Sequence, residues 1–110
     1  MEIETQDLGN GSLVRVSGEV DMSNSPTVRD SLMGLVKDKV PAIVVDLEAV
    51  SYMDSSGIAT LVEGLQETTS YGGKFRIAGL SEKVKQVFEL ARLTDVFDIY
   101  ADAEQAKEGL

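Results

Sequence analysis

Residues 42–57 decide the fold of this chain, and they read AIVVDLEAVSYMDSSG. Of the first six, Ala42 to Leu47, all but Asp46 are apolar, and they form a continuous run instead of an alternating one, which is typical of a strand covered on both faces. The last five, Met53 to Gly57, set a carboxylate and two adjacent hydroxyls where an amphipathic helix begins. Short side chains of this kind accept hydrogen bonds from the free N–H groups of a first helical turn. The stretch therefore predicts a buried strand that turns directly into a helix.

The chain after this junction predicts alternating helices and strands. Apolar residues from Ile58 to Leu65 fall at i, i+3, i+4 and i+7, which is the spacing of a buried helical stripe. Gly72 and Gly73 suit the end of that helix. The expected elements are a helix over residues 56–70, a strand over residues 74–79, a helix capped by Ser81, a strand over residues 96–100 and a last short helix over residues 102–110.

The chain before residue 42 predicts a hairpin followed by a helix. Ser25 and Pro26 supply a capping hydroxyl and a proline at the first helical position. The expected elements are a strand over residues 3–7, a turn over residues 8–11, a strand over residues 13–16, a strand end or bend over residues 18–21 and a helix over residues 26–38.

These elements predict one α/β domain over residues 1–110. Strands joined by helices run parallel, because a helical crossover returns the chain to the same edge of a sheet. The N-terminal hairpin adds an antiparallel pair. The expected fold is therefore a sandwich with a mixed sheet and about four helices packed mainly on one face. Ligand and partner sites of such sheets gather at the carboxyl ends of strands, where residues 54–57 lie.

The composition excludes several classes of chemistry. The chain has no cysteine and no histidine, so disulfides, thiol nucleophiles and the commonest metal ligand and general base are all missing. Its 19 acidic and 10 basic side chains give a formal net charge of −9, which opposes binding to nucleic acid or to an anionic membrane. A basic protein partner suits this charge better. We expect no cofactor and no metal.

Nothing in the sequence indicates targeting to a membrane. No stretch reaches the roughly 18 apolar residues that a membrane-spanning helix needs. Residues 1–9 also lack the basic and apolar blocks of a signal peptide. The cytosol is therefore the expected compartment.

Two interpretations of Asp54-Ser55-Ser56-Gly57 follow from the residues alone. The first is purely structural, because serine is among the best N-cap residues and mostly does only that. The second is a phosphorylation switch, in which one hydroxyl gains a phosphate with about −1.5 to −2 charges and three acceptor oxygens. A dianion at a helix N-terminus gains about 0.3–1 kcal/mol from the helix dipole at an exposed site, partly offset by repulsion from Asp54. Any large effect of a phosphate is therefore expected in binding and not in folding.

Three segments of the chain resemble the STAS domain, and specifically the anti-sigma factor antagonists of bacterial partner-switching pathways. Residues 18–21, Gly-Glu-Val-Asp, are similar to the family's G-E-[LVI]-D, and residues 45–53 are similar to its second apolar strand. Residues 54–57 are identical to its D-S-S-G. The segments occur in the family's order, and the resemblance covers almost the whole chain. It implies a STAS-like sandwich over residues 1–110.

The resemblance implies a switch at Ser55. In the family, the serine directly after the motif aspartate is phosphorylated by a serine kinase that is itself the anti-sigma factor. The unphosphorylated form binds this kinase and frees the sigma factor, whereas the phosphorylated form does not bind. A phosphatase acting on phospho-Ser55 would restore the hydroxyl.

The resemblance also implies roles for the neighbours of Ser55. Asp54 would orient the acceptor hydroxyl, and Ser56 would be the N-cap or the second-position partner of the helix. Gly57 would allow close approach of the kinase or of its nucleotide phosphates.

A second group of expected partner-binding residues lies at and after the strand end or bend over residues 18–21. The resemblance places Asp21 in the face that contacts the kinase, although from the residues alone it reads equally well as an Asx turn. Ser23 and Glu19 are weaker candidates. The three methionines at positions 22, 33 and 53 read either as adaptable interface contacts or as ordinary core.

Two other functions fit parts of the sequence. One is a STAS scaffold or adaptor subunit of a transport or stress-signalling complex, which uses the same fold without phosphorylation. The other is an enzyme with Ser55 or Ser56 as nucleophile, but without histidine no base occurs at a recognisable motif spacing. No phosphate-binding glycine motif follows a strand, so nucleotide binding by the domain has little support. The sequence favours the regulatory, non-enzymatic function.

Overall fold

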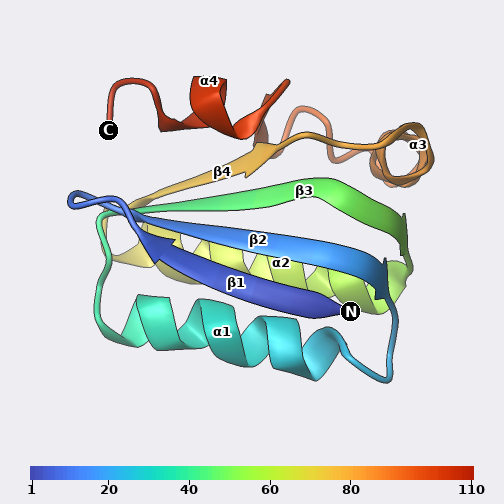
Figure 1. Ribbon diagram of the computed structural model, residues 1–110, viewed down its shortest axis with the longest axis horizontal. Helices are drawn as coiled ribbons and strands as arrows, with labels where there is room; N and C mark the ends of the chain where they lie inside the picture. The colour runs from blue at the N-terminus through green and yellow to red at the C-terminus, as the bar shows by residue number, and fades with distance from the viewer.

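The apolar stretch that begins at Ala42 forms the central strand of a five-stranded sheet with the order β1-β2-β3-β4-β5 (Figure 1). The structure is a computed structural model that describes residues 1–110. β1 is antiparallel to β2, and the other neighbours are parallel. The elements are β1 (Glu2–Asp7), β2 (Ser12–Val20), α1 (Ser25–Lys37), β3 (Ala42–Met53), α2 (Ser55–Ser70), β4 (Lys74–Ala78), α3 (Glu82–Leu90), β5 (Asp98–Tyr100) and α4 (Ala103–Lys107).

Helices cover the two faces of the sheet unequally. The main core lies between one face and α1, α2 and α3, which contribute residues such as Leu32, Leu61 and Phe88. A smaller cluster on the other face joins three strands to Ala103 and Ala106 of α4. Figure 1 shows α4 on the opposite side of the sheet from α1 and α2. The predicted mixed sandwich, with an N-terminal hairpin and helices mainly on one face, is confirmed.

The two strands that end at the site are long. β3 runs for 12 residues to Met53, past the apolar run that ends at Leu47 and up to the junction where the strand was expected to turn into a helix. Beyond Leu47 the strand passes out of the region where α4 covers it, so exposed residues interrupt the apolar pattern. β2 likewise continues through the expected bend at residues 18–21 to Val20, with two register irregularities and a positive φ at Gly18. Both strands therefore end at the same place.

The element boundaries correct two expectations and confirm a third. Asn24, and not Ser25, is the N-cap of α1, and Ser25 is a buried residue of its first turn. Ser81 does cap α3, accepting from the Val84 N–H. The last strand covers only residues 98–100, because Phe97 leaves the sheet to place its ring in the core, where the centroid of Phe88 lies 5.6 Å away. Tertiary packing overrides the extended pattern of residues 96–97.

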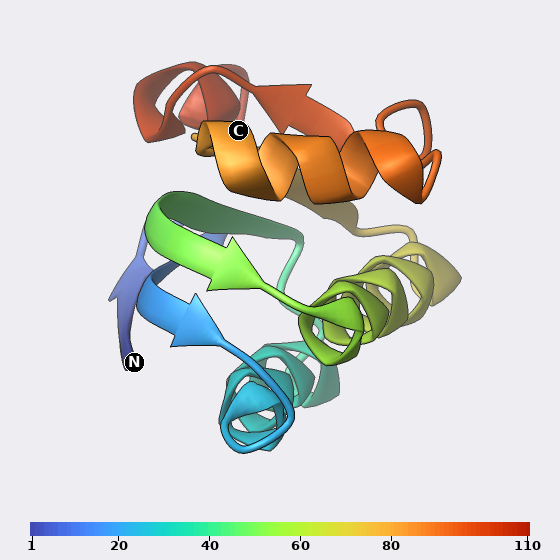
Figure 2. The same cartoon turned by 90° about the vertical axis from the view of Figure 1, so that its right-hand side faces the viewer.

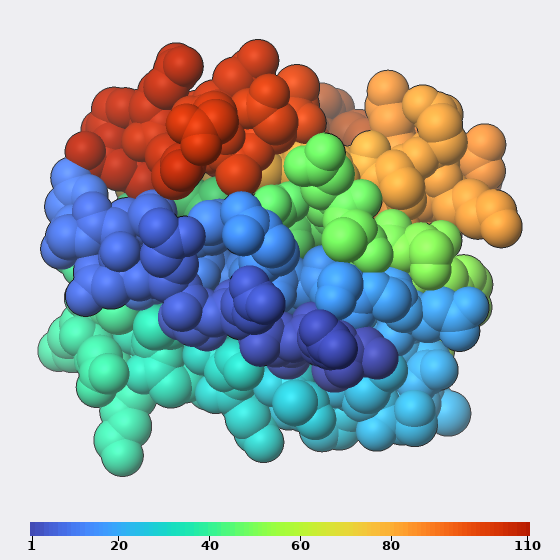
Figure 3. All heavy atoms as spheres, viewed as in Figure 1, coloured from blue at the N-terminus to red at the C-terminus, as the bar shows by residue number.

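Figures 2 and 3 show the molecule from one end of the sheet and from one side. Figure 2 views the molecule along the strands from the end where the arrowheads of β2 and β3 point, with the first turn of α2 and the loop before α1 in front. Figure 3 shows the side of the molecule where β1, in dark blue, lies at the surface between α1 and the C-terminal segment. The carboxyl ends of β2 and β3 are therefore placed side by side at one end of the molecule.

Candidate functional site

The pairing of β2 with β3 brings two turns together. Val20 and Met53 are register partners at the last position of each strand. The Asp54 N–H donates to the Val20 carbonyl at 3.1 Å, which fixes the two chain exits against each other. Asp21 and Asp54 therefore begin adjacent turns at the carboxyl edge of the sheet. The sequence predicted a site at this edge, but not that these two segments meet there.

Asp54 is the N-cap of α2. Its Oδ1 accepts from the Ser56 N–H at 2.9 Å, the Ser56 hydroxyl at 2.5 Å and the Gly57 N–H at 3.4 Å. The hydroxyl of Ser56 is the main cause of a lowered pKa for the Asp54 carboxyl, and the N–H groups of Ser56, Gly57 and Met22 lower the pKa further against the opposing effect of desolvation. The carboxylate is thus held ionised and directed into the first turn of the helix.

Ser55 and Ser56 have different surroundings although they are adjacent. Ser55 is exposed, and none of the side-chain hydrogen bonds within the chain involves its hydroxyl. Ser56 is half-buried, and its hydroxyl donates to Asp54. The expected alignment of the Ser55 hydroxyl by Asp54 is not what the structure contains, because Asp54 holds the other serine. Ser56 lies at the second position of α2, which is one of the two places expected for it.

Gly57 faces the interior. A Cβ at this position would lie 2.5 Å from Met53 Cγ and 3.0 Å from Val20 Cγ1, a separation that real Cβ atoms do not adopt. The glycine thus lets α2 begin directly over the ends of β2 and β3. This close packing accounts for glycine here whatever approaches from outside.

The turn after β2 repeats the geometry of the turn after β3. Asp21 Oδ1 accepts from the Ser23 N–H at 2.9 Å and from the Ser23 hydroxyl at 2.5 Å. Asn24 closes this turn, because its Oδ1 accepts from the Asp21 N–H at 3.0 Å and its Nδ2 donates to the Glu19 carbonyl at 2.9 Å. The Asx-turn interpretation of Asp21 is confirmed. Sequence reasoning missed Asn24, although its side chain at a turn before Ser-Pro was a usable signal.

The three methionines fall into two groups. Met53 is 2% exposed and belongs to the core, and Met33 is half-buried against it. Met22 is 78% exposed and lies between Asp21 and Ser23, at the position that Ser55 occupies in the other turn. Met22 is therefore the methionine that remains free to contact a partner.

The end of the molecule around Ser55 is acidic. Asp21, Asp54 and the exposed Glu19 lie on it, and neither of the first two takes part in a salt bridge within the chain. Arg29 of α1 is committed to Glu63 of α2 through two contacts of 2.8 Å, which raise the pKa of Arg29 and lower that of Glu63. None of the salt bridges in the chain places a cation at this turn. A phosphate on Ser55 would therefore meet the N-terminus of α2 but no cation that is already paired there.

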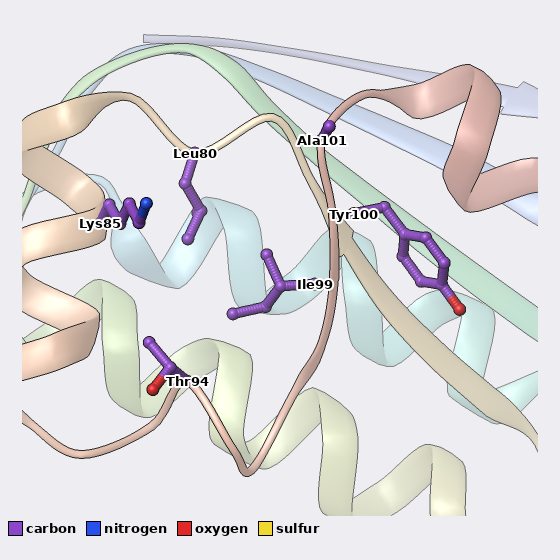
Figure 4. A pocket seen from close by; sticks show the side chains of 6 residues that line it. All are labelled: Leu80, Lys85, Thr94, Ile99, Tyr100 and Ala101. Carbon is purple, nitrogen blue, oxygen red and sulfur yellow. The ribbon is translucent and has the colours of Figure 1, made fainter.

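The hollows of the molecule do not include the two turns that begin at Asp21 and Asp54. The largest has a volume of about 320 Å³ and is lined by Leu80, Lys85, Thr94 and the segment from Ile99 to Ala101 (Figure 4). Neither this hollow nor the three smaller ones include any residue from Asp21 to Asn24 or from Asp54 to Gly57. No group of three or more acidic side chains is placed to hold a metal ion. The twin turns form an exposed surface, which is the shape of a protein-binding site more than of a small-molecule site.

Comparison with known proteins assigns the chain to a family. The model of the STAS domain matches residues 2–106. The chain therefore belongs to the STAS domain family. None of its helices is long and apolar enough to span a membrane.

Within this family, the chain is similar to several anti-sigma factor antagonists. The anti-sigma-B factor antagonist of Bacillus subtilis is 29% identical over 104 residues, which are 94% of each chain. That of Staphylococcus aureus is 31% identical over 104 residues, which are 94% of this chain and 96% of the relative. The crystal structure of an anti-sigma factor antagonist from Mycobacterium paratuberculosis matches with a TM-score of 0.88 and 28% identity, over 96% of this chain and 89% of that one.

Proposed function

We propose that this chain is an anti-sigma factor antagonist whose binding to a serine-kinase anti-sigma factor is ended by phosphorylation of Ser55. The relatives from Bacillus subtilis and Staphylococcus aureus, which align with it over nearly their whole length, are anti-sigma-B factor antagonists. The observation that carries the proposal is the exposed Ser55 hydroxyl, which has no partner in its own chain and lies on a surface without a cavity. The partner binds over Asp21, Ser23 and residues 54–56, with Gly57 shaping the surface from beneath.

The phosphorylation step uses a nucleoside triphosphate held by the kinase. The Ser55 oxygen forms a bond to the γ-phosphorus, the bond from that phosphorus to the bridging oxygen breaks, and the diphosphate leaves. The hydroxyl proton passes to a base of the kinase. A phosphatase acting on phospho-Ser55 reverses the change by hydrolysis and returns the hydroxyl.

Charge explains why the phosphate ends binding. The product carries about −1.5 to −2 charges, next to Asp54 and close to Asp21. A partner surface that accommodates a neutral hydroxyl then faces an anion without a counter-charge, which costs several kcal/mol when it is desolvated. The fold itself tolerates the phosphate because it lies at the N-terminus of α2. The switch therefore acts on association and not on folding.

An enzymatic function receives less support from this geometry. A serine nucleophile needs a base within hydrogen-bond reach and a third group to orient that base. Ser56 contacts a carboxylate, but that carboxylate is occupied as the cap of α2. A STAS scaffold or adaptor without phosphorylation remains the second candidate, since the exposed surface alone also suits a constitutive partner.

Binding measurements with two variants test the proposal. Anti-sigma factors of the host are titrated calorimetrically with the wild type, Ser55→Ala and Ser55→Asp, and each protein is incubated with magnesium ATP and analysed by mass spectrometry. We expect Ser55→Ala to bind as the wild type does but to take up no phosphate, and Ser55→Asp to bind weakly. Equal binding by both variants refutes the switch, and the absence of phosphate on the wild type with every host kinase favours the scaffold.

A further inference from the structure

We propose that Ser56 is a positioning residue that makes Ser55 the only phosphoacceptor of the pair, by donating its own hydroxyl to Asp54. This inference rests on the proposed function and adds the reason for the choice between two neighbouring serines. It also assigns Asp54 to Ser56, in place of a direct contact with the hydroxyl that reacts.

The hydroxyl of Ser56 is held by Asp54 and is not free to react. Its hydroxyl donates to Asp54 Oδ1 at 2.5 Å, and the same oxygen accepts from the Ser56 N–H at 2.9 Å. The hydroxyl and the N–H of Ser56 thus donate to the same carboxylate oxygen and close a short ring, and the residue is half-buried. These contacts hold the Ser56 oxygen toward the first turn of α2, so turning it out toward a docked phosphorus atom breaks a charge-assisted hydrogen bond, which is among the stronger kinds in proteins.

A second feature of the site is the Asp54 carboxylate. Three donors from Ser56 and Gly57 converge on Asp54 Oδ1 and direct its charge into the first turn of α2. A dianionic γ-phosphoryl group that approaches Ser55 would otherwise meet a mobile negative charge on the preceding residue. Repulsion of this kind falls with distance and with neutralisation by donors. The Ser56 hydroxyl therefore lowers the electrostatic obstacle to transfer onto Ser55.

Ser55 also has no base in its own chain. No hydrogen bond joins the Ser55 hydroxyl to Asp54 or to another acceptor of the chain, so the proton released when the Ser55 oxygen bonds to phosphorus goes to a base that the kinase supplies. Reaction then depends on a docked kinase, and the free protein remains unmodified. Thr60 adds to the rigidity of the site, since its hydroxyl donates to the Ser56 carbonyl at 3.0 Å.

The test compares phosphate transfer from a purified host anti-sigma kinase and magnesium ATP to four proteins: the wild type, Ser55→Ala, Ser56→Ala and Ser56→Thr. We expect phosphate on Ser55 alone in the wild type and none on Ser55→Ala. Ser56→Ala should accept phosphate on Ser55 with kcat/KM reduced about tenfold, because the Asp54 carboxylate keeps its two N–H donors but loses the hydroxyl, and its less neutralised charge repels the γ-phosphate. Ser56→Thr keeps the hydroxyl and should restore the rate to within about threefold of the wild type.

A carbon-13 titration of the Asp54 carboxyl gives a readout that does not need the kinase. Its pKa should rise toward the ordinary value of about 3.9 in Ser56→Ala and stay low in Ser56→Thr. Phosphate on Ser56 in the Ser55→Ala protein, or an unchanged Asp54 pKa in Ser56→Ala, overturns the inference while the switch at Ser55 stands. A wild type that accepts no phosphate from any host kinase instead overturns the proposed function, and the choice of acceptor with it.

Discussion

The turns after β2 and β3 are nearly identical in their hydrogen bonds and different in what they do. In each, an aspartate Oδ1 accepts from the N–H and the hydroxyl of the serine two residues later, at 2.9 and 2.5 Å. The first turn holds Met22 in its middle and ends with Asn24. The second holds Ser55 in its middle and ends with Gly57.

The shared hydrogen bonds determine only the backbone conformation of the two turns. The middle residue points to solvent in both turns, so its side chain decides whether the turn presents an apolar contact or a modifiable hydroxyl. The fourth residue decides the path of the chain. Gly57 lets α2 begin at once over Met53, whereas Asn24 hydrogen-bonds back to residues 19 and 21 before α1 starts.

The largest effect is expected from a charge in the middle of the second turn. Ser55→Asp should weaken binding to the anti-sigma factor about 100-fold, or about 2.7 kcal/mol, because an unpaired anion enters the interface. Its free energy of unfolding should change by less than about 0.5 kcal/mol. Gln66→Glu adds the same charge farther along α2 and should bind as the wild type in calorimetry. A matching loss of affinity in Gln66→Glu would show that net charge, and not this turn, is responsible.

The fourth residue of the second turn, Gly57, should not tolerate a side chain. Gly57→Ala should destabilise the fold by about 1–3 kcal/mol, because its Cβ overpacks Met53 and Val20. Gly34→Ala is the control, since nothing lies within 4 Å of a Cβ there and the helix gains about 0.5–1 kcal/mol. Urea denaturation measures both. A tolerated Gly57→Ala would mean that the start of α2 is not held against the strands as described.

The middle residue of the first turn should act through apolar contact. Met22→Ala should weaken binding to the anti-sigma factor about tenfold, which is about 1.4 kcal/mol, and leave the unfolding free energy unchanged because the side chain is 78% exposed. Met22→Leu keeps the apolar volume and should bind within about threefold of the wild type. Unaltered affinity of Met22→Ala would limit the interface to the second turn.

Removing each aspartate should show how much more a helix cap stabilises the fold than a turn does. Asp54→Ala should cost about 1–2 kcal/mol of stability, because the first turn of α2 loses its cap. Asp21→Ala should cost about 0.5–1 kcal/mol, because the Asn24 side chain still closes the turn through the backbone of residues 19 and 21. Urea unfolding of the two variants at pH 7 measures the difference. Equal costs would show that the cap adds nothing beyond the turn.

The smallest effect is a dependence of stability on pH. The pKa of the Asp54 carboxyl is lowered in the folded protein. Its ionised form therefore adds to the free energy of unfolding above the unfolded pKa of about 3.9, and this stabilisation is lost as the pH falls through the lower folded value. Asp54→Asn lacks this term, and its stability should fall less between pH 5 and pH 3 than that of the wild type in the same buffer. An equal loss of unfolding free energy in both proteins would show that ionisation of Asp54 does not stabilise the fold.

Local patterns predicted most of the secondary structure for reasons that lie in neighbouring residues. The capping of α3 by Ser81 and the buried spacing of α2 depend on contacts a few positions apart, and both are confirmed. The expected strand over residues 96–100 was too long, because Phe97 leaves the sheet to pack in the aromatic core, and that packing depends on residues far away in the sequence. For the candidate site, the motif located Ser55 but not the partner of Asp54.

By itself, the sequence determined the order of strands and helices, the buried central strand, the acidic charge and the junction where two hydroxyls meet a helix start. Those properties follow from side-chain polarity and spacing along the chain. Only the tertiary structure decided that Val20 and Met53 end side by side, that Asp54 accepts from Ser56 and leaves Ser55 free, and that Gly57 lies inside. The physical reason is that strand pairing and side-chain orientation depend on residues far apart in sequence, which no local pattern encodes.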